Sequence, residues 1–337
     1  MRTLIIGDIH GCYDELLDLF DKAALGPDDI VVSVGDLVDR GPNPSDVVRW
    51  FRQRANAVVL MGNHERKHVR QTFSYSQEVT RIQLGEHYAG DVEWMRGLPY
   101  FYETPEVRVV HAAMIPNVPL AEQPEDVLCG SVSGETKLRA LIPDGYWHEH
   151  YTDDKPVVFG HHVVGPEPLV RDGKVYGIDT GACHGGRLTA LSVPDGKLHS
   201  VPSRGDYWAG VAARYQVPVL RQRPWPTLSW RKIDEVIADR EGASGEDCEA
   251  YLAELVAWKT AVRSLVPVMF EQVPAVLAKV RASGADLADH PAKPLLFLLQ
   301  RGRLSLSDVE TRCPTPAATL ALAVKLDVDT SAVPPAP

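Results

Sequence analysis

Three short motifs in the first 65 residues each follow a run of apolar, mostly β-branched residues. The motifs are Gly7-Asp8-Ile9-His10-Gly11, Gly35-Asp36-Leu37-Val38-Asp39-Arg40-Gly41 and Gly62-Asn63-His64-Glu65. The runs before them, residues 4–6, 30–34 and 57–61, have the composition of buried strands. A strand that ends at Gly and then presents Asp, Asn or His places polar groups at its carboxyl end, where open α/β sheets bind ligands. Three such strands predict one site at which oxygen and imidazole groups converge.

Composition suggests a reducing compartment. The chain has 337 residues, 45% of them hydrophobic, which is enough for one large domain or two of ordinary size. No stretch approaches the roughly 18 consecutive apolar residues of a membrane span, and no signal segment precedes the first strand. The cysteines are odd in number and have no pair spacing, which favours reduced thiols: Cys12, Cys129, Cys183, Cys248 and Cys313. We therefore expect a cytoplasmic protein that does not bind a membrane.

The charge pattern favours cation binding. The formal net charge is −10, and most of the acidic excess lies in residues 1–205. All but one of the 12 histidines also precede residue 200. An acidic, histidine-rich first part suits metal or acid–base chemistry and offers no broad positive field for nucleic acid. Nucleic acid is therefore possible as a partner but is not indicated by charge.

The pattern of elements predicts a layered α/β domain. Apolar residues at helical spacing predict helices over 13–24 and 44–54, so the chain begins β-α-β-α-β. After about residue 100 it becomes strand-rich, with a loop-rich stretch expected at 116–154. The later strands are predicted at 107–110, 157–159, 175–178, 188–193 and 198–201.

The chain changes character after Trp208. We predict a catalytic domain at 1–205, a linker at 206–226, an all-helical C-terminal extension at 227–326 and a disordered tail at 327–337. The extension could form a lid over the site or only support the catalytic domain. Its prolines are expected to divide the second part of it into short helices: Pro267, Pro274, Pro291 and Pro294.

The three motifs supply four candidate metal ligands. Asp8 and His10 leave one strand end two residues apart, so both can face the same rim. Asp36 is the natural bridge, because one carboxylate can bind two cations through its two oxygens. Asn63 adds a neutral amide oxygen.

Two later strands also end in histidine. His111 follows residues 107–110, and His161 follows residues 157–160, with His162 as an alternative ligand to His161. Mixed oxygen and nitrogen ligation suits Mn²⁺, Fe or Zn²⁺ better than Ca²⁺, and we expect two divalent ions with Mn²⁺ favoured. Two such metals can clamp a phosphoryl group and activate a water molecule.

These motifs resemble the calcineurin-like metallophosphoesterases, specifically their phosphoprotein phosphatase branch. Within that branch, the segment from Gly177 to Leu191 is similar to bacterial enzymes of the symmetrical diadenosine tetraphosphatase type. The resemblance covers residues 1 to about 205 and implies a layered β-sandwich core flanked by helices. It further implies that one metal is held by Asp8, His10 and Asp36, and the other by Asp36, Asn63, His111 and His161.

The resemblance also implies catalytic roles for three residues. His64 would protonate the leaving oxygen, Asp39 would orient His64, and Arg40 would bind the phosphate. These roles make physical sense, because a carboxylate partner favours protonated imidazole and a guanidinium offers a planar fork to phosphate oxygens. The branch also uses a second phosphate-binding arginine, but residues 128–135 contain none; Arg139 is the candidate substitute.

Residues 64–68 also match the H-E-x-x-H pattern of zinc proteases. That pattern requires both histidines on one face of an established helix, whereas here it begins directly after a strand. A protease site would leave the other candidate ligands unexplained. We therefore expect His68 to be a polar helix residue.

The leading functional hypothesis is a dinuclear-metal phosphoesterase that hydrolyses a dinucleoside polyphosphate or related nucleotide. One alternative is a serine/threonine protein phosphatase acting on a phosphoprotein with the same metal site. Another is an RNA end-processing phosphatase, or a module that binds a partner through the C-terminal helices. The segment from Gly177 to Leu191 favours the first.

Overall fold

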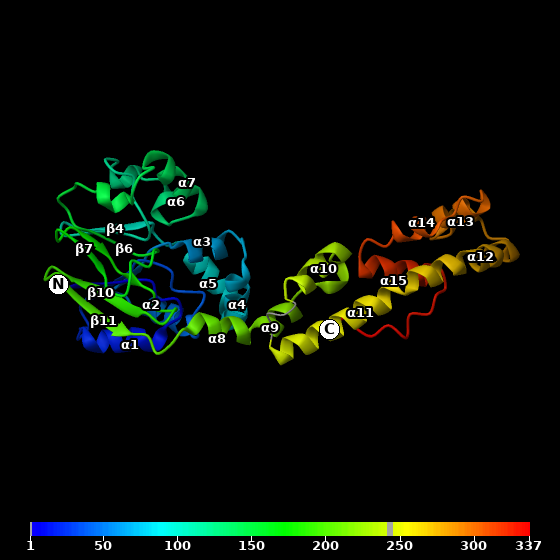
Figure 1. Ribbon diagram of the computed structural model, residues 1–337, viewed down its shortest axis with the longest axis horizontal. Coiled ribbons are helices and arrows are strands. Elements are labelled where there is room, and N and C mark those ends of the chain that lie inside the picture. Colours follow the sequence, from blue (N-terminus) through cyan, green and yellow to red (C-terminus); the bar gives the residue numbers. More distant parts are fainter. Residues whose placement is uncertain (1, 241–244) are drawn as a thin grey trace. The chain divides into compact units, whose positions relative to one another are not determined.

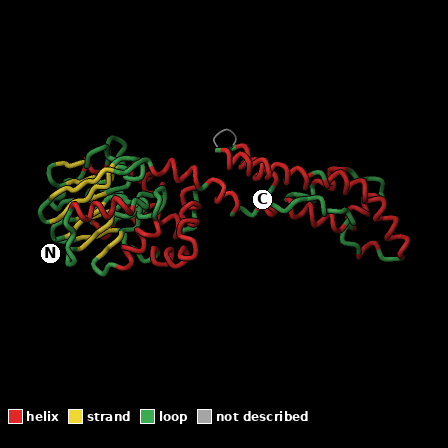
Figure 2. The backbone as a smooth tube through the Cα atoms, turned by 90° about the horizontal axis from the view of Figure 1, so that it is seen from below, coloured by secondary structure: helices red, strands yellow, loops and turns green. Residues whose placement is uncertain are grey.

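The computed structural model describes residues 2–240 and 245–337. The chain divides into two compact units, residues 1–215 and 216–337. Figure 2 shows the strands gathered in the first unit, while the second is built from helices and loops. Each unit is described by itself.

Two sheets form the centre of the first unit (Figure 1). The first sheet has the strand order β11-β10-β1-β2-β3, with β9 paired to β10, and the second has the order β4-β5-β6-β8-β7. The strands of the first sheet are β1 (Thr3–Ile6), β2 (Ile30–Ser33), β3 (Ala57–Val59), β9 (Asp179–Thr180), β10 (Arg187–Val193) and β11 (Lys197–Pro202). Those of the second are β4 (Phe101–Glu103), β5 (Arg108–Val110), β6 (Val157–Phe159), β7 (Leu169–Arg171) and β8 (Val175–Gly177).

The two sheets share a buried apolar layer. Ile5 and Val32 from the first sheet belong to one cluster with Val109 and Val158 from the second. The strands β1, β2 and β3 run parallel, as do β5, β6 and β8, so within each sheet their carboxyl ends share an edge. The loops that follow these carboxyl ends carry the residues of the site.

Helices cover the outer faces of both sheets (Figure 1). α1 (Tyr13–Lys22) and α2 (Pro44–Gln53) bury apolar faces against the first sheet, where Leu16 and Val47 join the cluster that contains Leu4. Beyond the second sheet lie α6 (Glu125–Leu128) and α7 (Val132–Leu141). The remaining helices of this unit are α3 (Asn63–Val69), α4 (Tyr75–Leu84), η1 (Gly85–His87), α5 (Tyr88–Met95), η2 (Leu120–Glu122), η3 (Trp147–His150) and α8 (Tyr207–Arg214).

The second unit is helical. Its elements are α9 (Gln216–Arg221), η4 (Trp225–Thr227), α10 (Trp230–Ala238), α11 (Glu246–Arg263), α12 (Leu265–Ser283), η5 (Leu287–Asp289), α13 (Lys293–Gln300), α14 (Leu306–Glu310) and α15 (Pro316–Lys325). Two apolar clusters hold them together, one around Trp225 and Leu255 and the other around Met269 and Leu295. By length and composition, one stretch of the described chain, 246–283, could cross a membrane, but core helices pass the same test and Met269 and Val273 of this stretch are fully buried.

The predicted fold class, an α/β sandwich core with a helical C-terminal extension, is confirmed, and each later strand lies within a residue or so of its expected place. Three local expectations differ from the structure. The stretch 116–154 contains α6 and α7 rather than only loops, and the expected linker contains α8 and α9. The expectation of short helices was wrong for Pro267 and Pro274: α12 has 19 residues, with Pro267 in its first turn, where a missing N–H costs nothing, and Pro274 inside it. It was right for Pro291 and Pro294, since α13 and α14 have 8 and 5 residues.

The C-terminal residues also differ from their expected disorder. Val328 and Val333 pack against the second unit's apolar clusters, and the hydroxyl of Tyr251 donates a hydrogen bond of 3.1 Å to the carbonyl of Pro337. The two valines give this Pro- and Ala-rich segment enough apolar surface to attach.

Candidate metal centre

Five strands deliver polar residues to one edge of the sandwich. β1 leads to Asp8 and His10, β2 to Asp36, and β3 to α3, which begins at Asn63. The second sheet contributes through β5 and β6, each of which is followed by a histidine: His111 and His161. The structure thus brings all six predicted ligand residues to one region, in two interlocking groups that share Asp36.

The backbone of the site is strained. His10, Asp36, Asp39, Arg40 and His161 all adopt positive φ angles, between 45° and 71°. Residues with a Cβ rarely adopt this conformation, and it persists where the surrounding structure enforces it. Such strain commonly marks functional sites.

Two glycines let the carboxylates approach the backbone. A Cβ at Gly62 would lie 2.1 Å from Oδ1 of Asp36, and one at Gly160 would lie 2.0 Å from Oδ1 of Asp8. Both distances are far inside van der Waals contact. The glycines that precede Asn63 and His161 are therefore required by the position of the acids.

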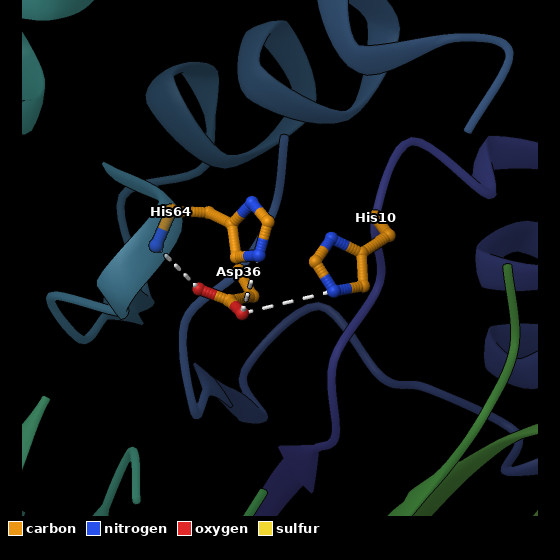
Figure 3. Close-up of side chains that lie close together, drawn as sticks. All are labelled: His10, Asp36 and His64. Carbon is orange, nitrogen blue, oxygen red and sulfur yellow. Dashed lines mark hydrogen bonds and ion pairs between the residues drawn. The ribbon is translucent and has the colours of Figure 1, made fainter. Parts of the chain in front are cut away.

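Asp36 lies among imidazoles (Figure 3). Its Oδ2 is 3.7 Å from Nε2 of His10 and 3.9 Å from Nε2 of His64, and its Oδ1 is 3.5 Å from Nε2 of His111. Burial opposes ionisation, but His111, His64, His10 and His161 together hold the pKa of Asp36 below its ordinary value. The carboxylate is thus anionic and central, as a bridge between two cations requires.

Outer hydrogen bonds set the tautomers of the histidines. Nδ1 of His10 donates to the carbonyl of Val38 over 2.8 Å, and Nδ1 of His111 donates to the carbonyl of Val34 over 3.0 Å. The Nε2 atom of each ring is left with a lone pair that faces the site. Burial, and next the neighbouring His64, lowers the pKa of His10 to about 3, so its ring is neutral.

His161 uses the opposite nitrogen. Its Nε2 donates to Oε1 of Glu135 over 3.3 Å, so the lone pair is on Nδ1, which lies 3.1 Å from Oδ1 of Asn63. Nε2 of His111 lies at the same distance, 3.1 Å, from that oxygen. Nε2 of His111, Nδ1 of His161 and Oδ1 of Asn63 thus lie close together, as three ligands of one cation would. His162 is exposed and does not share these contacts with Asn63.

A second buried carboxylate, that of Asp8, lies close to Asp36. Asp8 accepts hydrogen bonds at both oxygens from the backbone N–H of His161, at 3.0 and 3.1 Å. Burial, then the charges of Asp179 and Asp36, raises its pKa, and burial raises the pKa of Asp179 to about 6. Such crowding of buried like charges fits a site that divalent cations neutralise.

Asp39 lies at the centre of a separate hydrogen-bond network. Nδ1 of His64 donates to Oδ2 of Asp39 over 2.5 Å, Nε2 of His68 donates to Oδ1 over 3.0 Å, and the amide of Gln77 also donates to Oδ2. Burial opposes ionisation, but these two histidines hold the pKa of Asp39 well below its ordinary value. His68 lies in a helix, as expected, but it is fully buried and supports Asp39, a role that the sequence did not indicate.

Arg40 lies between a candidate metal ligand, His10, and the proposed proton donor, His64. Its Nη1 lies 3.1 Å from Nε2 of His10, and its Nη2 lies 3.0 Å from Nε2 of His64. Arg139 differs: its side chain is 83% exposed and lies 3.6 Å from Oε2 of Glu135. Arg40 is thus fixed at the site, whereas Arg139 lies on its periphery.

Four residues of the site, Glu65, His68, Gln77 and Asp179, have roles that the sequence did not indicate. Glu65 accepts hydrogen bonds from the backbone N–H groups of Asp36 and Leu37, so it holds the loop that carries the central acid. Glu65 could have been noticed in the sequence, because it is the last residue of the third motif. Asp179 was detectable as an acid after an apolar strand, and His68 through its i, i+4 spacing from His64 on one helix face. For Gln77 no local signal exists.

Comparisons with known proteins agree with this geometry. The family model of calcineurin-like phosphoesterases matches residues 1–193. The asymmetrical bis(5'-nucleosyl)-tetraphosphatase PrpE of Halalkalibacterium halodurans is 32% identical over 240 residues, which is 60% of this chain and 95% of that relative. The symmetrical bis(5'-nucleosyl)-tetraphosphatase of Erwinia tasmaniensis is 26% identical over 270 residues, covering 60% of this chain and 98% of that relative.

One solved structure is also similar. A crystal structure described as a proposed diadenosine tetraphosphatase shares 28% identity and a TM-score of 0.50, over 60% of this chain and 93% of that one.

Proposed function

The chain belongs to the calcineurin-like phosphoesterase family and is a metal-dependent hydrolase, and on this basis we propose that it hydrolyses dinucleoside polyphosphates. The observation that carries the proposal is the convergence of carboxylates and imidazoles around Asp36. The substrate class is supported by relatives that the chain matches over nearly their whole length. The five free, buried cysteines fit a reducing, cytoplasmic setting.

The six candidate ligands divide into two sets. Asp8, His10 and Asp36 would hold one divalent ion, and Asp36, Asn63, His111 and His161 the other. We propose Mn²⁺ as the resident metal, with Fe or Zn²⁺ as alternatives, because the donors mix carboxylate, amide and imidazole. Two ions here would polarise the phosphoryl oxygens and supply a nucleophilic water.

Arg40 binds the phosphate in this proposal. Its guanidinium already lies within hydrogen-bond distance of His10, a candidate metal ligand, and of His64, the proposed proton donor. A planar fork can contact two phosphoryl oxygens at once and stabilise the charge that develops on them.

His64 delivers the proton to the leaving oxygen. Because Nδ1 donates to Asp39, the proton to be transferred must be carried on Nε2. In the structure Nε2 accepts a hydrogen bond from Nη2 of Arg40 over 3.0 Å, so the guanidinium must leave this nitrogen for the phosphate before Nε2 carries the proton. The ionised Asp39 stabilises imidazolium and fixes the ring. The network of His68 and Gln77 around Asp39 keeps that carboxylate in place.

Product analysis tests the proposal. The full chain with Mn²⁺ is offered diadenosine tetraphosphate, a phosphoserine peptide and a 5'-phosphorylated oligonucleotide at equal concentration, with the variant Asp36→Asn as a control. We expect nucleotide products only from the first, as two ADP for symmetrical cleavage or ATP plus AMP for asymmetrical cleavage. Faster phosphate release from the peptide or oligonucleotide, or equal turnover by the control, would contradict the proposal.

A further inference from the structure

A cavity of about 620 Å³ opens beside the candidate metal centre. His161 and His162 line one end of it, and the segment 145–149 lines another part. Its size falls within the range of about 300–1,000 Å³ that is usual for small-molecule sites. Because His161 belongs to both, a molecule held at the metals can extend directly into this cavity.

Aromatic rings form much of the wall. The rings of Tyr146 and His148 are parallel within 5°, with centroids 5.6 Å apart, and those of His148 and Phe159 lie within 20° at 5.4 Å. Trp147 packs edge-on against Phe159. Tyr146 is 63% exposed, so a large aromatic face remains open at the rim.

The wall carries both basic and acidic groups: Arg139 and three histidines line it together with two carboxylates. Glu135 and Glu149 both line the cavity, and the guanidinium of Arg139 lies 3.6 Å from Oε2 of Glu135. Carboxylates repel an anion but accept hydrogen bonds from amino and hydroxyl groups. Residues 128–135, where the family resemblance predicts a phosphate-binding arginine, instead contribute Gly130 and Glu135 to this wall.

We propose that this cavity binds the nucleoside attached to the phosphate at the metal centre, with the base stacked on Tyr146. The inference rests on the proposed function and names the part of the substrate that this subsite recognises. A flat base with an exocyclic amino group matches an aromatic wall bearing carboxylates, and adenine is such a base. The exposed ring of Tyr146 offers a stacking face that a nucleoside can use and a bare phosphate cannot.

Inhibition of p-nitrophenyl phosphate hydrolysis tests this subsite. AMP and ribose 5-phosphate carry the same phosphate and sugar, so the ratio of their inhibition constants isolates the base. In the full chain with Mn²⁺ we expect AMP to inhibit about tenfold more tightly, the scale of one base–aromatic stack. Tyr146→Ala should bring the ratio close to one, and Tyr146→Phe should retain it.

Phe101→Ala is the matched control, because Phe101 is another exposed aromatic residue of the first unit that does not line the cavity. It should keep the wild-type ratio. Equal inhibition by the two compounds, or a preference for AMP that survives Tyr146→Ala, would overturn the inference. The assay uses no dinucleoside substrate, so failure of the subsite is distinguished from failure of the proposed function.

Discussion

His68 donates a hydrogen bond from Nε2 to Oδ1 of Asp39 over 3.0 Å, while His64 occupies the other oxygen of the same carboxylate. The hydroxyl of Tyr88 lies 3.1 Å from Nδ1 of His68 and can donate to it, which leaves the proton on Nε2. The two histidines are four residues apart on α3, so one carboxylate is held by a single helix face. Asp39 therefore orients His64, the proposed proton donor, and His68 in turn holds Asp39 in place.

This relationship predicts different results for two substitutions of His68. His68→Leu removes the donor and should lower kcat by about tenfold to a hundredfold, because a hydrogen bond to a buried charge contributes about 1.5–3 kcal/mol. KM should change little, since His68 lies behind Asp39. His68→Gln can present an amide N–H near the same place and should recover most of the loss.

Steady-state kinetics on diadenosine tetraphosphate would check this prediction, with circular dichroism to confirm folding. A His68→Leu enzyme with wild-type kcat would show that Asp39 needs only His64 and Gln77. Equal losses in both variants would indicate that packing, rather than the hydrogen bond, is what matters.

For His64→Ala we expect a loss that depends on the leaving group. A p-nitrophenolate leaves without a proton, whereas the alkoxide of a phosphoserine peptide needs one. In the variant, kcat for the slow hydrolysis of the phosphoserine peptide should fall by about a hundredfold or more. For p-nitrophenyl phosphate, kcat should fall by less than about tenfold. The backbone N–H of residue 64, which donates to Oδ1 of Asp36 over 3.1 Å, remains in the variant.

Parallel kinetics on the two substrates would measure this difference. His87→Ala changes an exposed histidine of the same unit and should leave both activities unaltered. Identical losses for the two esters in His64→Ala would assign His64 a role other than proton donation.

Glu135 should control metal affinity through His161. Its Oε1 accepts the proton of Nε2, which directs the lone pair of Nδ1 toward Asn63. Removing such an outer partner typically weakens metal binding by about tenfold to a hundredfold. Calorimetric titration of Glu135→Ala with Mn²⁺ should show one weakened site and one nearly unchanged site, and Glu122→Ala, an exposed acid elsewhere, should show neither effect. If both sites of Glu135→Ala bind Mn²⁺ with unchanged affinity, Glu135 does not control metal binding through His161.

Stability at acid pH should depend on Asp29. Arg2 donates to its Oδ2 from Nε over 3.1 Å and from Nη2 over 2.5 Å, and this pairing holds the pKa of Asp29 below its ordinary value of 3.8. Because the folded pKa is depressed, the charged form stabilises the protein above pH 3.8, and this contribution is lost as the pH falls through the folded pKa.

We therefore expect Asp29→Asn to lose about 1 kcal/mol at pH 7, because solvent screens this partly exposed pair, and to approach the wild type as the pH falls below the folded pKa of Asp29. Urea denaturation at several pH values measures the difference. Asp28→Asn, a neighbouring exposed acid, is the control. A gap between wild type and Asp29→Asn that persists unchanged at low pH would contradict the assignment.

The sequence predicted the six candidate ligands because each follows a strand end that is visible locally. Asp36 and His111 are distant in the chain, yet both stand after short β-branched runs. Pairing of β5 with β6 and of β1 with β2 then gathers these ends at one edge. Local strand signals and parallel pairing together are enough to place such a site.

Other parts of the site depend on contacts that leave no local pattern. α7 carries Glu135 to His161, but Gly134 is the residue it buries most fully, so no apolar stripe marks the helix in the sequence. The partnership of Gln77 with Asp39 joins α4 to a turn 38 residues away. His68 was visible only as half of a zinc-protease pattern, and its partner became clear only once the helix was placed beside Asp39.

The most direct test of the account is anomalous diffraction at the manganese absorption edge from crystals of the full chain grown with Mn²⁺. We predict two peaks about 3.5–4 Å apart, both bound by Asp36, with Asp8 and His10 at one and Asn63, His111 and His161 at the other. A single peak, or a metal bound by Glu135 and His162 with Asp36 unligated, would contradict the dinuclear centre on which the proposed function depends.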